Sequence, residues 1–176
     1  QIRKILAYSS TAHLGWMILV LQYNPSLTAL ALSVYLVMTS AAFLSLITNK
    51  ATTLNTLATS AMKTPILTAV LPMTLLSLGG LPPLTGFLPK WFILQEMIKQ
   101  GLPVIATFIA MSTLISLYFY LRLTYVMTLT TSPNNLAGTT PWRLPPQNLF
   151  RMLPPCLTLS AALLPLAPTF QALISL

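Results

Sequence analysis

Long uncharged apolar runs fill most of the 176-residue chain, and charged residues, prolines and asparagines separate them. A helix needs about 20 apolar residues to cross a bilayer. The pattern predicts helices at residues 5–21, 26–47, 66–78, 87–100, 103–126 and about 150–174. The stretch 49–64 is too polar for the bilayer core and is predicted to be an interfacial loop or a short surface helix, and 132–148 is predicted to be a loop. We therefore expect an all-α, polytopic transmembrane helix bundle, with one membrane domain over residues 1–176.

A cluster of glycines and prolines interrupts the apolar sequence at residues 79–86. The residues concerned are Gly79, Gly80, Pro82, Pro83 and Gly86. Unpaired backbone groups are costly in hydrocarbon, so such a break persists only where protein or a polar cavity covers it. The sequence predicts a broken helix here, and hydropathy leaves open whether its halves make two short crossings or one interrupted crossing.

Composition supports a membrane protein over a nucleic-acid-binding one. The chain is 55% hydrophobic and only 6% charged, against about 25% charged residues in ordinary globular domains. Nine Lys and Arg stand against a single acidic residue, Glu96. The basic residues are scattered between the apolar runs, whereas phosphate binding needs a basic patch or stripe. The predicted surrounding is the lipid bilayer, with no nucleic acid.

The residue counts also argue against several kinds of chemistry within this chain. Cys156 is the single cysteine, which excludes an internal disulfide, a cysteine-based zinc site and an iron–sulfur cluster held by this chain alone. With one Glu, no Asp and one His, there is neither a carboxylate pair nor a Ser-His-Asp triad. No nucleotide-binding glycine motif occurs. The chain opens with Gln1 rather than Met, and we expect it to be part of a longer protein.

Lys90 is the strongest candidate for a functional residue. It follows the predicted break inside a nearly uncharged stretch, and an ionisable group in a span is a functional hypothesis by default. A lysine removed from water can take up and release a proton. The alternative is that the break lies at the membrane interface, where Lys90 would be an anchor beside Trp91, Gln95 and Glu96.

His13 is the second candidate, because it lies inside the first predicted span. Ser9 lies four residues earlier and shares a helix face with it, so ring and hydroxyl can join a line of polar groups and water. The alternative is a packed histidine bonded to a neighbouring helix. Glu96 and Lys99 are three residues apart and are predicted to form a local ion pair, which makes Glu96 a weaker candidate.

Aromatic and basic residues gather towards the end of the 103–126 run. They are Tyr118, Tyr120 and Arg122. Such residues are typical of the interface between membrane and water, where an arginine stem can extend to the polar layer. We therefore expect all three at that interface, with Arg122 either an anchor there or a structural partner for a carboxylate elsewhere.

Three long segments resemble a known family. They are QIRKILAYSSTAHLGWM at 1–17, MTLLSLGGLPPLTGFLPKWFILQEM at 73–97 and LYFYLRLTY at 117–125. The sequence resembles the second half of the mitochondrially encoded antiporter-like subunits of respiratory complex I, over essentially all 176 residues. The acid-poor composition, rich in Thr, Leu and Met, is similar to that of vertebrate mitochondrial products.

The resemblance implies a core membrane subunit of the proton-translocating NADH:ubiquinone reductase. The expected location is the mitochondrial inner membrane, in a hetero-oligomer with the other membrane-arm subunits. Proton translocation would be coupled there to electron transfer from NADH to ubiquinone. No cofactor is expected in this chain, because FMN, iron–sulfur clusters, NADH and ubiquinone are implied in partner subunits. The expected fold is most of the second of two inverted repeats, each with a broken helix.

The resemblance also implies roles for individual residues in a central file of polar groups. Lys90 is expected to be the terminal lysine on the exit side, and His13 a member nearer the middle. Another antiporter-like subunit carries a second histidine in the following helix, and this chain has none there. The file would then depend on water or on hydroxyls such as those of Tyr35, Thr39 and Ser40.

Two other functions remain open from the sequence. One is a structural membrane-arm subunit that does not pump. The other is a stand-alone cation/proton antiporter, which would normally place an Asp or Glu at its ion site. The absence of Asp and the position of Glu96 argue against the antiporter.

Overall fold

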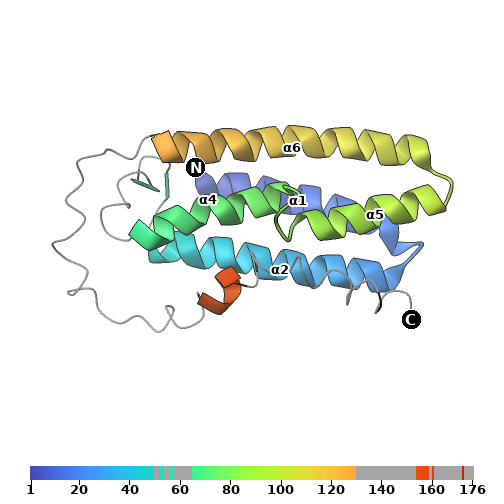
Figure 1. Ribbon diagram of the computed structural model, residues 1–176, viewed down its shortest axis with the longest axis horizontal. Coiled ribbons are helices and arrows are strands. Elements are labelled where there is room, and N and C mark those ends of the chain that lie inside the picture. The colour runs from blue at the N-terminus through green and yellow to red at the C-terminus, as the bar shows by residue number, and fades with distance from the viewer. Residues whose placement is uncertain are drawn as a thin grey trace.

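The described part of the chain is a bundle of helices joined by turns (Figure 1). The computed structural model describes residues 1–49, 52–53, 56–57, 65–129, 154–158, 160 and 172. Its helices are α1 (Ile2–Leu21), α2 (Pro25–Thr48), α4 (Pro65–Gly79), α5 (Phe87–Lys99) and α6 (Pro103–Leu129). The expected all-α fold is confirmed for these residues. The predicted loop 132–148, and most of 49–64 and 150–174, lie outside the described residues.

Proline marks the first residue of three helices. These are Pro25 of α2, Pro65 of α4 and Pro103 of α6. The first turn of a helix has no intrahelical partner for its N–H groups, so proline is tolerated there and its fixed φ suits the helix. Asn24 before α2 is extended, with φ −145° and ψ 94°, which is where the chain turns into the helix.

Among the described residues, three helices are long and apolar enough to cross a membrane: Lys4–Leu21 within α1, and the whole of α2 and α6. They have 20, 24 and 27 residues in total. At about 1.5 Å per residue, each is close to or longer than a hydrocarbon core of about 30 Å. Length and composition therefore give three candidate membrane spans.

The two short helices, α4 and α5, follow one another along the long axis of the bundle, and the break lies between them (Figure 1). They have 15 and 13 residues, so at about 1.5 Å per residue neither alone matches a hydrocarbon core of about 30 Å. α4 packs against α2 and α6, while α5 packs against α1, α2 and α6. The two short helices therefore lie end to end, with the break between them.

The apolar core is divided into two clusters, one around each short helix. The cluster around α4 includes Leu71, Leu75, Leu78, Val34 and Leu123, all nearly inaccessible. The cluster around α5 includes Phe92, Ile93, Met97, Val20 and Leu27. The break lies between α4 and α5, and its glycines are buried whereas Pro82 and Pro83 are exposed.

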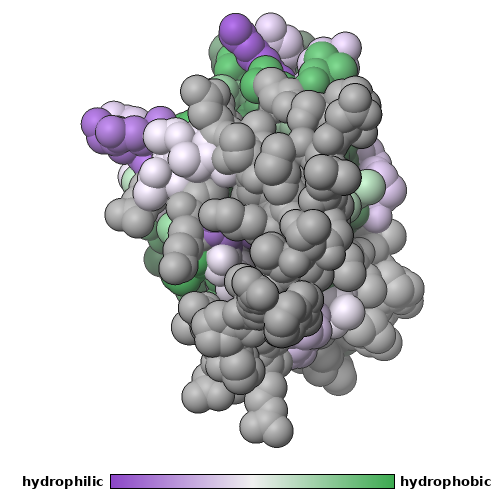
Figure 2. All heavy atoms as spheres, turned by 90° about the vertical axis from the view of Figure 1, so that its left-hand side faces the viewer, coloured by the Kyte–Doolittle hydropathy of each residue, from purple (hydrophilic) through white to green (hydrophobic). Residues whose placement is uncertain are grey.

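Large apolar side chains also cover much of the outside of the bundle. On α6, Phe108 is 74% exposed, Ile115 73% and Met111 66%. Figure 2 shows apolar residues at the surface beside hydrophilic ones, seen from the end of the bundle near the N-terminus. Exposed apolar surface of this extent is typical of a chain that contacts lipid or other protein chains.

Candidate functional site

Helix α4 ends in a turn that leaves a carbonyl group free to bind a side chain. Gly80 has φ +86°, its N–H donates to the Ser77 carbonyl at 3.0 Å, and the Leu81 N–H donates to the Leu76 carbonyl at 3.4 Å. This pairing is the Schellman motif, for which glycine is favoured because of its positive φ. The last carbonyls of a helix lack intrahelical partners, and that of Gly79 accepts a hydrogen bond from Lys90 instead.

The loop of the break packs its own backbone against the end of α4. A Cβ atom on Gly86 would lie 1.7 Å from the Ser77 carbonyl oxygen, so only glycine fits this position. This close approach brings the first turn of α5 beside the last turn of α4. Lys90 lies in that first turn, and this is why its side chain can reach Gly79.

The Lys90 ammonium group is enclosed at the end of α4. The residue is 9% exposed, and its Nζ donates to the Gly79 carbonyl over 2.9 Å. A Cβ atom on Gly80 would lie 2.9 Å from the same Nζ, so the absence of a side chain there makes room for it. The C-terminal end of a helix carries partial negative charge, which favours a cation. The structure thus places Lys90 inside the bundle, beside the break.

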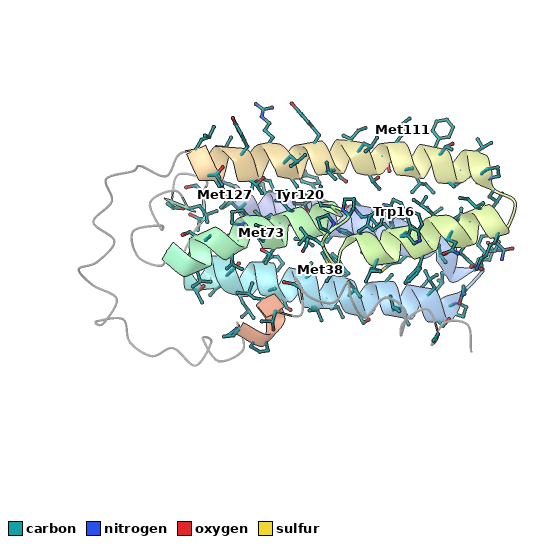
Figure 3. All side chains as sticks on the ribbon, in the orientation of Figure 1. Trp16, Met38, Met73, Met111, Tyr120 and Met127 are labelled. Atoms are coloured by element: carbon teal, nitrogen blue, oxygen red, sulfur yellow. The ribbon has the colours of Figure 1, made fainter. Side chains whose placement is uncertain are left out.

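A small cavity joins Lys90 to His13 and Tyr35. It has a volume of about 20 Å³, and about 10–15 Å³ is enough for one water molecule. The His13 and Tyr35 rings lie against each other, with centroids 4.8 Å apart and planes inclined at 34°. The rest of the lining comprises Trp16, Met17, Ala31, Val34, Met38, Gly86, Pro89 and Ile93, of which Figure 3 labels Trp16 and Met38.

The His13 ring and the Tyr35 hydroxyl each have a second polar neighbour. His13 faces the Leu78 backbone in the last turn of α4. Tyr35 faces the side chain of Ser10 on α1. Polar groups from α1, α2, α4 and α5 therefore meet where the bundle is interrupted, and they can hold a proton or a water molecule between them.

The other predicted hydroxyls bond to their own helices. Ser9 Oγ donates to the Leu6 carbonyl at 2.8 Å, Thr39 Oγ1 to the Tyr35 carbonyl at 2.9 Å, and Ser40 Oγ to the Val37 carbonyl at 2.8 Å. Back-bonding to the preceding turn is common for Ser and Thr in helices. None of the three lines the cavity, although Ser9 still offers lone pairs to a neighbour.

Glu96 lies away from the cavity, near the end of α5. Its Oε2 is 3.8 Å from Lys99 Nζ, and its Oε1 accepts a hydrogen bond from Gln100 Nε2 at 3.5 Å. The predicted local ion pair with Lys99 is confirmed. Because surface ion pairs contribute little, this pair is a minor part of the fold.

Two family models together cover nearly the whole chain. Residues 1–116 match the model described as NADH:quinone oxidoreductase/Mrp antiporter, TM. The chain belongs to the NADH:quinone oxidoreductase/Mrp antiporter transmembrane family. Residues 117–171 match a second model, described as NADH dehydrogenase subunit 2 C-terminus. The family resemblance inferred from the sequence is thereby confirmed.

Curated relatives of this antiporter family are similar along the full chain. NADH-ubiquinone oxidoreductase chain 2 of Gadus morhua is 62% identical over 178 residues, which is 100% of this chain and 51% of the relative. The protein of the same name from Salmo salar is 60% identical over 176 residues, covering 100% of this chain and 50% of the relative. The chain spans about half the length of the curated relatives it matches.

Sequence reasoning did not predict the burial of one residue of this family member. Tyr120 was expected at the membrane interface with Tyr118 and Arg122, and the structure packs it inside the bundle, where only 3% of it is exposed. Tyr118 is 66% exposed, so neighbouring aromatic positions face opposite ways. The sequence did contain a pattern that could have predicted this burial. Tyr120, Leu123 and Met127 are spaced to share one face of a helix, and all three are buried in α6.

Proposed function

We propose that this chain takes part in proton translocation by respiratory complex I, the NADH:ubiquinone oxidoreductase of the mitochondrial inner membrane. Similarity to proteins named NADH-ubiquinone oxidoreductase chain 2 supports the assignment to that complex. In the proposal, α1, α2 and α6 each cross the membrane, and α4 with α5 makes one interrupted crossing. Together they are most of the second of two inverted repeats. The proposal also includes the further membrane span that the sequence predicts at residues 150–174.

The observation that carries the proposal is the enclosed Lys90 ammonium beside the cavity. Lys90 can carry a full positive charge beside this cavity, and the Gly79 carbonyl gives that charge a fixed partner. His13 lines the same cavity and can accept and donate a proton through its two ring nitrogens. One water molecule between them would complete a path for proton transfer.

The mechanism we infer is electrostatic. Charges separated by a few ångströms in a poorly screened interior interact far more strongly than in water. Protonation of one group in a file therefore changes the protonation of the next. In this scheme Lys90 gives up its proton outward when a neighbouring group becomes charged, and His13 then supplies the next one. The redox steps and their FMN and iron–sulfur clusters would belong to partner subunits.

A stand-alone cation/proton antiporter receives less support. The single acidic residue of the sequence, Glu96, is paired with Lys99 and does not line the cavity. A site for Na⁺ would need carboxylate or several carbonyl oxygens turned towards the ion. A structural subunit that does not pump is the alternative against which the proposal is tested.

Replacing His13 with leucine is expected to slow proton uptake by about a hundredfold, since a positioned acid or base typically contributes two orders of magnitude or more. Leucine fills similar space and removes both ring nitrogens from the cavity. The measurement is NADH-driven acidification of sealed vesicles containing intact complex I, normalised to the assembled complex. Thr11→Leu is the matched control, because Thr11 lies on the same helix and is exposed.

The two variants separate the active role from the structural one. The proposal requires slow proton uptake for His13→Leu and a wild-type rate for Thr11→Leu. Equal, wild-type rates for both would show that His13 is only a packed side chain and would favour the structural subunit.

A further inference from the structure

A buried hydroxyl on α6 lies beyond the cavity and has no role in the scheme above. Tyr120 is 3% exposed, and its Oη is shielded from solvent. Within the described residues, this Oη has no hydrogen-bond partner at 3.5 Å or less. Buried polar groups are nearly always bonded to protein or to an ordered water. A phenylalanine would fill the same apolar space, so the hydroxyl needs a reason of its own.

The Tyr120 ring lies next to the carbonyl that binds Lys90. A Cβ atom built on Gly79 would be 3.4 Å from Tyr120 Cβ and 3.5 Å from its Cδ2, so the ring packs directly on this glycine. The carbonyl of Gly79 is the one that accepts from Lys90 Nζ. Figure 3 labels Tyr120 on the side of α6 that faces the rest of the bundle. Tyr120 and Lys90 therefore contact the same residue at the end of α4.

The Tyr120 hydroxyl faces polar groups of two other helices. It faces the side chain of Ser9 on α1, and Tyr35 on α2 is close enough to act on it electrostatically. Ser9 Oγ uses its proton to bond the Leu6 carbonyl, which leaves its lone pairs as acceptors. Tyr35 in turn faces Ser10, the neighbour of Ser9, and lines the cavity with His13. Tyr120 thus lies near hydroxyl groups of α1 and α2, and one of them, that of Tyr35, belongs to the lining of the cavity.

We propose that Tyr120 and Ser9 together bind a water molecule, and that this site extends the proton route from the His13 and Lys90 cavity to α6. The inference rests on the proposed function, since it gives that route a further member. In each transfer the Tyr120 hydroxyl receives a proton on its lone pair from one neighbour and gives its own proton to the next. No bond other than O–H is made or broken, and the phenol is restored after every step.

A purely structural role would be a direct hydrogen bond from Tyr120 to Ser9 that holds α6 against α1. Such a bond would affect stability and assembly, but it would leave the kinetics of proton transfer unchanged. The test therefore needs a measurement that is sensitive to the proton-transfer step itself, such as the ratio of rates in H₂O and D₂O.

The test uses Tyr120→Phe in intact complex I in sealed vesicles, with Tyr118→Phe as the matched control on the exposed side of α6. Tyr120→Phe keeps the ring on Gly79 and removes only the hydroxyl. We expect NADH-driven proton uptake to fall about tenfold per assembled complex, with a changed solvent isotope effect. Tyr118→Phe is expected to match the wild type in both measurements.

Ser9→Ala provides a second route to the same answer if Tyr120→Phe fails to assemble. It removes the other half of the proposed water site and leaves the packing of α6 intact, and we expect the same loss. Wild-type proton uptake and isotope effect for Ser9→Ala, or for an assembled Tyr120→Phe complex, would overturn the inference. If these variants behave like the wild type but His13→Leu is slow, only the water site at Tyr120 is wrong and the proposed function survives. If His13→Leu is also normal, both the water site and the proposed function are overturned.

Discussion

Replacing Lys90 with methionine is expected to lower the coupled NADH:ubiquinone oxidation rate of assembled complex I by about tenfold or more. Methionine keeps much of the side-chain volume and removes the ammonium group that bonds the Gly79 carbonyl. A factor of ten corresponds to about 1.4 kcal/mol in the barrier, which is modest for loss of a proton-transferring group. The rate is measured in tightly sealed vesicles, normalised to the amount of complex.

Arginine at the same position separates charge from proton exchange. Lys90→Arg retains a cation for the end of α4, but a guanidinium group does not release its proton in proteins. We expect Lys90→Arg to be as slow as Lys90→Met, and Lys99→Met to be normal because Lys99 lies exposed on the same helix. A full rate with arginine would mean that Lys90 serves only as a fixed charge on α4.

Replacing Gly86 with alanine is expected to prevent accumulation of the assembled subunit. The added Cβ atom would lie 1.7 Å from the Ser77 carbonyl oxygen and 2.7 Å from Met38 Cε. The methionine can move, but the carbonyl belongs to the last turn of α4, so the break and α5 must shift. Overpacking of this kind typically costs about 1–3 kcal/mol and can cost more. The measurement is the amount of assembled complex on native gels.

Gly15→Ala is the matched control for that experiment. Gly15 lies within α1, and a Cβ atom there would meet nothing within 4 Å. Alanine in a helix interior is favoured over glycine by about 0.5–1 kcal/mol, so assembly should be unchanged or slightly improved. Wild-type assembly of Gly86→Ala would contradict the close packing of the break against α4.

The positions of the helices follow from the distribution of charge and proline along the chain. The five described helices begin and end within three residues of the ranges expected from the sequence. The largest differences are at α1, which begins at Ile2 and so includes Lys4, and at α6, which continues to Leu129. Charge marks where an apolar run stops, but a helix extends into the polar layer as long as its backbone bonds continue.

The glycines and prolines of the break indicated a broken helix, but its geometry required the structure. Positive φ at Gly80 and the contact of Gly86 with Ser77 are tertiary features. They put Lys90 beside the Gly79 carbonyl. Hydropathy alone could not show that α4 and α5 lie end to end.

The candidate site was only partly accessible to sequence reasoning. Ionisable residues in apolar runs identified Lys90 and His13, which the structure brings to one cavity. Hydroxyl residues are harder to assign, because the same side chain can bond its own helix or a neighbour. Tyr35 lines the cavity, while Thr39 bonds its own helix. Tyr120 was missed because an aromatic residue near an arginine is typical of the membrane interface.

Whether protons pass through the site at Lys90 is tested most directly by the number of protons moved per NADH oxidised. Intact complex I would be reconstituted in sealed vesicles with Lys90→Met or Lys99→Met in the full-length subunit. We expect a lower ratio, or loss of coupled turnover, for Lys90→Met and the wild-type ratio for Lys99→Met. An unchanged ratio and rate for Lys90→Met would contradict this expectation and would leave this chain a structural part of the membrane arm.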